Sequence, residues 1–497
     1  MLQFPSARRL LAVRRRWFAL VVVCLAQLMN TLDGTIVNVA LPTIQADLHF
    51  SQANLTWVVD GYLITYGSFL LFAGRLGDLI GRKPVFIAGL VLFTVASAAC
   101  GLAHDQMVLV AARLVQGIGG AVSSSVIVAI IVTEFSDPAA RTRAMSTYIF
   151  TAVGGGSIGL LLGGALTQSI DWHWIFFINL PIGVVAAILG RALLQDTRGL
   201  GLSHGIDVLG SILMTLAVMV ATFTIVEAPS TGWTSPQTLA LGFIAVFLLV
   251  AFAVLQQRLA NPIMPLRILR LGGLTSSSAV RGLAATGMFA CFFLGSLYLN
   301  RILGFGPVQT GLAFLPMTIT VGTLSLGATA RLVERFGPRQ CTSFGLIAIV
   351  AALVLLSGAG EQTTYFPRLF FAFGLLGLGA GTSFMPLLTI ALAGVPAEDA
   401  GLASGIVNVS MQLSAALGLA VLGSISSDRT AWLVAQGASL NTALLDGFHL
   451  SFVVAGGCVG AGLLAAQVLL RSPNSATRND DTVLEMEPER WRSVDAA

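Results

Sequence analysis

Two ionisable side chains fall inside long apolar stretches of the sequence, where charge is unusual. Asp33 lies within the first such stretch and Arg113 within the fourth. A charged side chain in the hydrocarbon core of a bilayer costs at least about 2.5 kcal/mol on insertion scales, so it normally faces water, an opposite charge or backbone carbonyls. A carboxyl group that water reaches can exchange a proton, and a nearby arginine alters the field at that group. Asp33 and Arg113 are therefore candidates for proton coupling. A contact with a cationic substrate is also open for Asp33, and a purely structural contact between helices is the alternative for each.

A second charged feature is a short glycine-rich hinge between two apolar stretches. Residues 74–84 read GRLGDLIGRKP, and a weaker copy at 330–339 reads ARLVERFGPR. The acid can accept hydrogen bonds from arginines or lie at a helix N-terminus, where negative charge is favoured, and glycines permit a tight turn. Such a charge network can hold one conformation and break in another. A loop that is basic only to fix the topology is the alternative. The predicted conformational gate comprises Gly74, Asp78, Gly81, Arg82, Arg331 and Glu334.

Two weaker patterns concern helix packing and a candidate cavity. Glycines at four-residue spacing predict a face for close helix packing. They are Gly155, Gly159 and Gly163, followed by Gly164. Polar and aromatic side chains within other apolar stretches are candidates for a substrate cavity. Ordinary packing is the alternative for the aromatic residues, contact between helices is the alternative for Asn408 and Gln412, and a solvated helix end is the alternative for Asp60. The candidate cavity residues are Asn30, Asp60, Tyr62, Tyr66, Asn408 and Gln412.

The composition requires a membrane environment. Of the residues, 56% are hydrophobic and 10% are charged, and the mean hydropathy is +0.86, whereas a soluble domain has about 25% charged residues. The five cysteines all lie in apolar stretches, which indicates packing rather than a disulfide framework or a metal site. The only lysine, Lys83, is not followed by Ser or Thr, so the chain has no Walker A loop. With no grouping of a nucleophile and a base either, we expect no enzyme, no cofactor and no metal.

The apolar stretches predict an all-α integral membrane protein. A helix needs about 20 residues to cross the hydrocarbon core. Fourteen stretches satisfy this, centred near residues 28, 64, 94, 120, 155, 184, 217, 247, 287, 318, 348, 380, 413 and 458. The arginine-rich N-terminus resembles a signal peptide, but the first apolar stretch continues without a small-residue cleavage pattern, so a first membrane helix is the better interpretation.

Charge and repeat together predict the topology. Most of the 27 lysines and arginines fall in connections on one side, which places both termini in the cytoplasm by the positive-inside rule. The hinge copy lies eight stretches after the original rather than six, which indicates two six-helix bundles with two additional central helices. The predicted boundaries are a cytoplasmic N-terminal arm at 1–16, a first bundle at 17–198, two linking helices at 199–260, a second bundle at 261–471 and a cytoplasmic tail at 472–497.

Several motifs are similar to those of one known family. Residues 32–42 read LDGTIVNVALP, residues 172–183 read WHWIFFINLPIG, and Arg113, Gln116 and Gly117 stand in a helix 4 pattern. Together with the hinge and the stretch 401–423, they resemble the major facilitator superfamily, specifically its fourteen-helix drug:proton antiporter branch. The resemblance covers residues 17 to about 470.

The sequence also departs from that family's pattern. The helix 5 motif of the family has a proline after its first glycine, but residues 159–164 read GLLLGG. Met411, Ser414 and His173 stand where the family commonly has other residues. The missing proline bears on the direction of transport more than on the fold.

The resemblance implies a proton-coupled secondary transporter that exports amphipathic drugs or antibiotics across the cytoplasmic (inner) membrane by alternating access. Its partners would be the proton, the lipid bilayer and a small amphipathic substrate, which could be cationic. We expect no nucleic-acid partner, and we expect the protein to be a monomer. Two alternatives stay open. One is a proton symporter that imports a small solute, and the other is a membrane sensor or scaffold that transports nothing.

Overall fold

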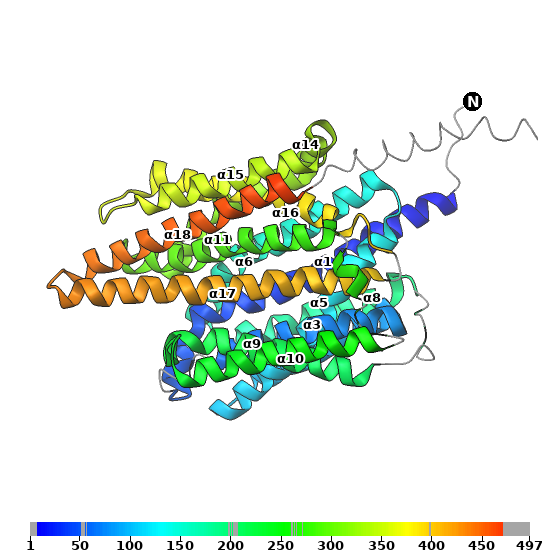
Figure 1. Cartoon of the computed structure of the whole chain (residues 1–497), viewed down its shortest axis with the longest axis horizontal. Helices are drawn as coiled ribbons and strands as arrows, with labels where there is room; N and C mark the ends of the chain where they lie inside the picture. Colours follow the sequence, from blue (N-terminus) through cyan, green and yellow to red (C-terminus); the bar gives the residue numbers. More distant parts are fainter. Residues whose placement is uncertain are drawn as a thin grey trace, which may run out of the picture.

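The protein is a bundle of long, nearly parallel helices (Figure 1). The computed structural model describes residues 7–470 apart from 51–54, 56, 197–198, 200, 202–206, 260–261, 263, 265, 271 and 397–398. No strand occurs among the described residues. The predicted tail at 472–497 and the first six residues of the predicted arm lie outside them. The remainder of the arm belongs to α1, which begins at Ala7.

The helices follow the predicted apolar stretches in order. In the N-terminal part they are α1 (Ala7–Asp47), α3 (Trp57–Ile80), α4 (Arg82–Gly101), α5 (Gln106–Glu134), α6 (Pro138–Ser169), α7 (Trp174–Phe177), α8 (Asn179–Leu193), α9 (Val208–Thr231) and α10 (Pro236–Arg258). In the C-terminal part they are η2 (Leu266–Arg270), α11 (Gly272–Arg301), α12 (Pro307–Ala313), α13 (Leu315–Thr323), η3 (Leu324–Ala328), α14 (Thr329–Phe336), α15 (Pro338–Ser357), η4 (Tyr365–Leu369), α16 (Phe370–Leu392), α17 (Ala400–Ala435) and α18 (Leu440–Leu469).

Twelve helical segments in the described part of the chain are long and apolar enough to cross a membrane. A thirteenth is α6, when its two bent halves, Pro138–Gly156 and Leu161–Ser169, are taken as one span. The stretch predicted around residue 318 is helical but interrupted, because α12, α13, η3 and α14 follow one another with Gly327 at a φ of 114°. The all-α membrane fold is therefore confirmed, and the fourteenth crossing stays a prediction for this interrupted segment.

Polar residues begin several of these helices at the expected places. Asp105 accepts a hydrogen bond from the backbone N–H of Val108 at 2.9 Å and so caps α5. Asp137 caps α6 in the same way, and Pro138 occupies its first turn, where a missing N–H is harmless. These caps fix where α5 and α6 start, and α5 carries Arg113.

The helices form two groups with a seam between them. In the N-terminal half α1 packs on α6 and α8, and α5 packs on α3 and α4; in the C-terminal half α11, α15, α16, α17 and α18 pack together. Across the seam, α3 and α5 contact α17, and α6 contacts α12, α13 and α16. The start of α1 and the end of α18 lie toward the same end of the bundle (Figure 1).

The additional pair, α9 and α10, lies at the edge of this seam. The two helices pack against each other, and α9 also contacts α3 and α17. Phe243 and Phe247 of α10 are 73% and 61% exposed, which is expected for side chains that face lipid. The pair therefore lines one side of the seam, and Val218 of α9 and Phe252 of α10 join the buried core there. The domain boundaries at 198 and 260 stay predictions.

Candidate functional site

Asp33 and Arg113 form a fully buried ion pair between α1 and α5. The Nη1 atom of Arg113 donates to Oδ2 of Asp33 at 2.5 Å, and the two side chains are 1% and 0% exposed. Arg113 also donates from Nε to the carbonyl of Val58 on α3 at 2.7 Å, and its guanidinium carbon lies 4.4 Å from the ring centre of Tyr62. Each charge is compensated by the other, which is the condition for keeping such a pair in a low-dielectric interior.

Uncharged groups complete the coordination of the Asp33 carboxylate. Gln116 donates from Nε2 to Oδ1 of Asp33 at 2.8 Å, and Asn179 of α8 donates to the same oxygen at 3.3 Å. Both amides also donate to the hydroxyl of Ser97 on α4, at 3.0 and 2.9 Å. We call Asp33, Arg113, Gln116, Asn179 and Ser97 the carboxylate network. Every one of these side chains is at most 1% exposed.

The sequence revealed part of this network. Asp33 and Arg113 were predicted from their charge, and Gln116 and Asn179 stand in the motifs that carry the family resemblance. Ser97 was missed, because a serine in an apolar helix is common and its place next to Asn179 depends on how α4 meets α8. No spacing in the sequence predicts that contact.

The predicted cavity residues lie in several environments. Asn30 donates from Nδ2 to the hydroxyl of Ser124 at 2.7 Å, and the rings of Tyr62 and Tyr66 stack with centres 5.5 Å apart. Asn408 is buried, whereas Asp60 and Gln412 are half-buried. None of the six lines any of the four described cavities. A substrate role for them stays a prediction.

Asp78 of the hinge joins the two halves. Its carboxylate accepts hydrogen bonds from the backbone N–H groups of Gly401 and Leu402 at 3.1 and 3.0 Å, in the first turn of α17. Arg82 donates from Nη2 to Oδ1 of Asp78 at 3.3 Å, and its Nη1 donates to the hydroxyl of Thr133 at 2.5 Å. A carboxylate at a helix N-terminus accepts unpaired N–H groups and meets the positive end of the helix dipole. We call this end of the bundle the hinge end.

The glycines of the hinge allow that contact. A Cβ atom at Gly74 would lie 2.7 Å from the carbonyl oxygen of Gly401, so any larger residue would push α3 away from α17. Gly81 has a φ of 104° and turns the chain from α3 into α4, a conformation that other residues rarely adopt.

A second ion cluster at the hinge end was not predicted. Asp399 lies just before α17, and its carboxylate is 3.7 Å from Arg75 of α3 and 3.3 Å from Arg267 of η2. The 3.7 Å contact is an ion pair rather than a hydrogen bond, since Nη1 of Arg75 has no hydrogen-bond partner among the described residues. An acid before a helix was the available sequence signal, but its arginine partners come from distant elements.

The hinge copy has a different environment. Arg331 and Glu334 lie on α14 and are exposed, and within the described part of the chain neither makes a hydrogen bond or an ion pair. Glu334 is therefore not a structural counterpart of buried Asp78 in this conformation. Their gate role stays a prediction.

The glycines of α6 lie against α1. A Cβ atom at Gly155 would meet Thr31 at 3.1 Å, one at Gly159 would overlap the hydroxyl of Thr35, and one at Gly163 would lie 2.8 Å from the carbonyl oxygen of Ile36. Gly164 is also buried. These contacts let α6 approach the helix that carries Asp33.

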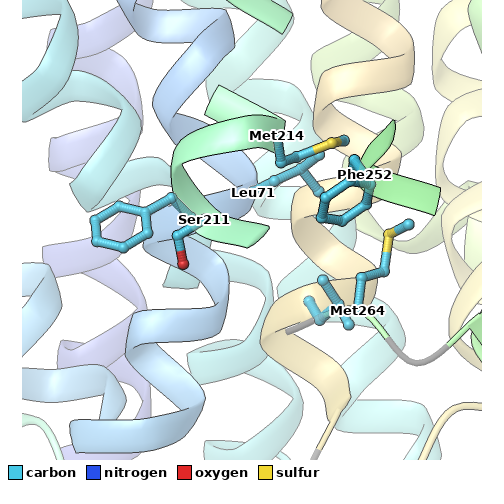
Figure 2. Close-up of a pocket in the computed structure, with 7 residues that line it drawn as sticks. Leu71, Ser211, Met214, Phe252 and Met264 are labelled. Atoms are coloured by element: carbon cyan, nitrogen blue, oxygen red, sulfur yellow. The ribbon is translucent and has the colours of Figure 1, made fainter. Parts of the chain in front are cut away.

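Apolar side chains pack beside the Asp78 contact. Figure 2 shows Met214 of α9, Phe252 of α10 and Met264 gathered around Leu71 of α3, in a small pocket that Leu402 also lines. Because Leu402 donates to Asp78, this apolar cluster lies directly next to the polar contact and covers the seam on that side. A larger cavity of about 760 Å³ lies between α11, α17 and α18.

These features define a multi-pass membrane protein with two helical halves, a buried ion pair in one half and a polar contact that closes the seam at one end. The family model of the Major Facilitator Superfamily matches residues 23–419, and the chain belongs to that superfamily of transporters. The match confirms the resemblance found in the sequence.

Named relatives and a solved structure agree with this assignment. The chain is 36% identical over 455 residues to the puromycin resistance protein pur8 of Streptomyces alboniger, covering 91% of this chain and 90% of that protein. It is 32% identical to the tetracenomycin C resistance and export protein of Streptomyces glaucescens, covering 84% and 77%. The structure of the human organic anion transporter MFSD10 aligns with a TM-score of 0.63 and 18% identity, over 91% of this chain and 99% of that chain, which shows a shared fold.

Proposed function

We propose that the protein is a proton-coupled antiporter that exports drug-like or antibiotic compounds by alternating access. The names of its relatives support this cargo class, since they describe resistance to or export of puromycin, tetracenomycin C and cephamycin. The observation that carries the proton coupling is the buried pair of Asp33 and Arg113.

The pair supports coupling because its charge balance depends on one proton. Protonation of Asp33 removes the negative charge that compensates Arg113. The guanidinium then keeps uncharged partners, which are the carbonyl of Val58, the amide of Gln116 and the rings of Tyr62 and Phe176. A buried charge that loses its counter-ion is destabilised by several kcal/mol. The protonated protein therefore favours a conformation in which water or another group reaches Arg113.

The gate contacts support alternating access. Asp78 holds the N-terminus of α17, and Asp399 holds Arg75, so the two halves are joined at the hinge end. Opening at this end requires those contacts to break. A ligand or a proton can drive this opening only if it binds the open and the closed conformation with different affinities. The substrate would then bind between the halves.

The orientation and assembly belong to the same proposal. The protein lies in the cytoplasmic membrane as a monomer, with both termini and the hinge end in the cytoplasm. The excess of arginines in the connections at the hinge end supports this orientation. The described ends of α1 and α18 also lie toward one end of the bundle (Figure 1).

Inverted membrane vesicles test the proposal. Puromycin and tetracenomycin C serve as probes, and a proton gradient with the acidic side in the lumen, directed outward, is imposed on vesicles with and without the protein. Export from cells corresponds to gradient-driven accumulation in these vesicles, abolished by an uncoupler. If cells instead take up the probe with protons, a symporter is indicated. If neither probe moves in either direction, the result contradicts the proposal and favours a membrane sensor or scaffold.

A further inference from the structure

A second buried arginine, Arg281 of α11, lies in the C-terminal half and has a different environment from Arg113. It is 5% exposed, and its Nε and Nη1 atoms are fully buried without a hydrogen-bond partner among the described residues. The hydroxyls of Ser277 and Ser278 share this condition. On a helix, residues three and four positions before Arg281 lie next to it along the same side. Unsatisfied donors therefore gather at one place on α11.

The contacts of Arg281 do not compensate its charge. Its guanidinium carbon lies 5.4 Å from the ring centre of Phe384 on α16. A cation–π contact stabilises a cation far less than the loss of its hydration destabilises it. An aromatic ring therefore leaves the guanidinium short of a counter-ion.

The acids inside the described part of the protein are already engaged. Asp33 is paired with Arg113, Asp78 with Arg82 and the start of α17, and Asp399 with Arg75 and Arg267. Glu134 accepts hydrogen bonds from the backbone and the side chain of Gln195. These pairings leave Arg281 as a buried cation that no described carboxylate balances.

The position of Arg281 relates it to the transport path. Arg281 lies against Phe384 of α16, and α16 contacts α6 of the N-terminal half. α6 contacts α12, α13 and α16 across the seam. When the halves separate, a side chain at this seam becomes accessible. A planar guanidinium that is accessible can bind a carboxylate through two parallel hydrogen bonds.

We propose that Arg281, together with Ser277 and Ser278, is a subsite for an anionic oxygen group of the cargo, a carboxylate above all. This inference rests on the proposed export function and specifies its substrate class. It differs from the expectation of a cationic cargo, because the uncompensated charge on the protein side is positive.

A matched pair of dyes tests the subsite. Rhodamine B carries a free carboxylate, and its ethyl ester has the same ring system without that charge. Binding of each dye to the full-length protein in nanodiscs is measured by fluorescence anisotropy for the wild type, R281Q and R281K. We expect the wild type to bind the acid more tightly than the ester. R281Q should weaken binding of the acid at least about tenfold, the effect of losing a hydrogen bond to a charged group, and leave binding of the ester unchanged.

The controls separate this inference from the general function. R281K keeps the charge without the planar fork, so it should retain part of the preference. Arg335→Gln makes the same substitution at an exposed position of α14 and should leave the preference intact. No binding of rhodamine B to the wild type, no preference for the acid, or a preference that R281Q or R281K leaves unchanged would overturn the subsite. Proton-driven accumulation of puromycin in vesicles would in that case still support the export function.

Discussion

Asp78 and Leu402 are 324 positions apart, and the backbone N–H of Leu402 donates to Oδ2 of the Asp78 carboxylate at 3.0 Å. The same carboxylate accepts from Gly401, so one side chain of the N-terminal half binds the first turn of a helix in the C-terminal half. The contact exists only while the halves are together at the hinge end. It therefore links a local hydrogen bond to the conformation of the whole protein.

Asp78→Asn should slow turnover much more than it weakens binding of the cargo. The amide keeps the size of the side chain but loses the charge that meets the start of α17, and hydrogen bonds to a charged group contribute about 1.5–3 kcal/mol. The maximal rate of probe transport should fall at least about tenfold at a nearly constant half-saturating concentration. Asp428→Asn makes the same exchange at an exposed position of α17 and should behave as the wild type. A lower affinity with an unchanged maximal rate would contradict the gate.

Asp399→Asn should loosen the same end of the bundle. This change removes the negative charge that pairs with both Arg75 and Arg267. We expect faster hydrogen–deuterium exchange in the first turn of α17, and a larger effect in the double variant with Asp78→Asn. Exchange in α15, which lies away from this contact, serves as the internal reference. Unchanged exchange at the start of α17 would show that the Asp399 cluster does not hold the gate.

Gly163→Ala should destabilise the N-terminal half. The added Cβ would lie 2.8 Å from the carbonyl oxygen of Ile36, a backbone atom that cannot rotate away. Overpacking of this kind costs about 1–3 kcal/mol, so the midpoint of thermal unfolding should fall. Gly457→Ala on α18 is the matched control, because nothing lies within 4 Å of a Cβ there. Equal stability of the two variants would argue against close packing of α6 on α1.

Arg113→Gln should be more harmful to folding than neutralising both members of the pair. The single change leaves Asp33 buried without a counter-ion, which typically costs about 3–5 kcal/mol. The double variant Asp33→Asn with Arg113→Gln removes both charges, and its thermal stability should recover toward that of the wild type. Its proton-driven transport should remain lost. A double variant no more stable than Arg113→Gln alone would show that the pair is not balanced as described.

The sequence predicted those parts of the molecule that depend on composition along the chain. Apolar length located the helices, and the cost of charge in lipid identified Asp33 and Arg113. The contacts between distant elements were not predictable in this way. Ser97 and Asn179 meet because of how α4 packs on α8, and Asp399 meets Arg75 because α17 lies against α3.

The repeat of the hinge shows a further limit. Sequence similarity suggested equivalent roles for Asp78 and Glu334, yet one is buried against α17 and the other is exposed on α14. Their surroundings differ because α13 and α14 are interrupted by Gly327, whereas α3 runs unbroken to the hinge. A spacing of residue types that recurs within the chain does not by itself place the same contacting residues opposite each copy.

The role of Asp33 in proton coupling is tested most directly by comparing two modes of transport in the Asp33→Asn variant. Inverted vesicles are loaded with unlabelled puromycin to measure exchange without a gradient, and empty vesicles with an imposed proton gradient measure accumulation. The variant should keep exchange of labelled puromycin and lose accumulation, because its amide cannot release a proton while the cargo path remains intact. Accumulation at the wild-type level in Asp33→Asn would remove this carboxylate from the coupling mechanism.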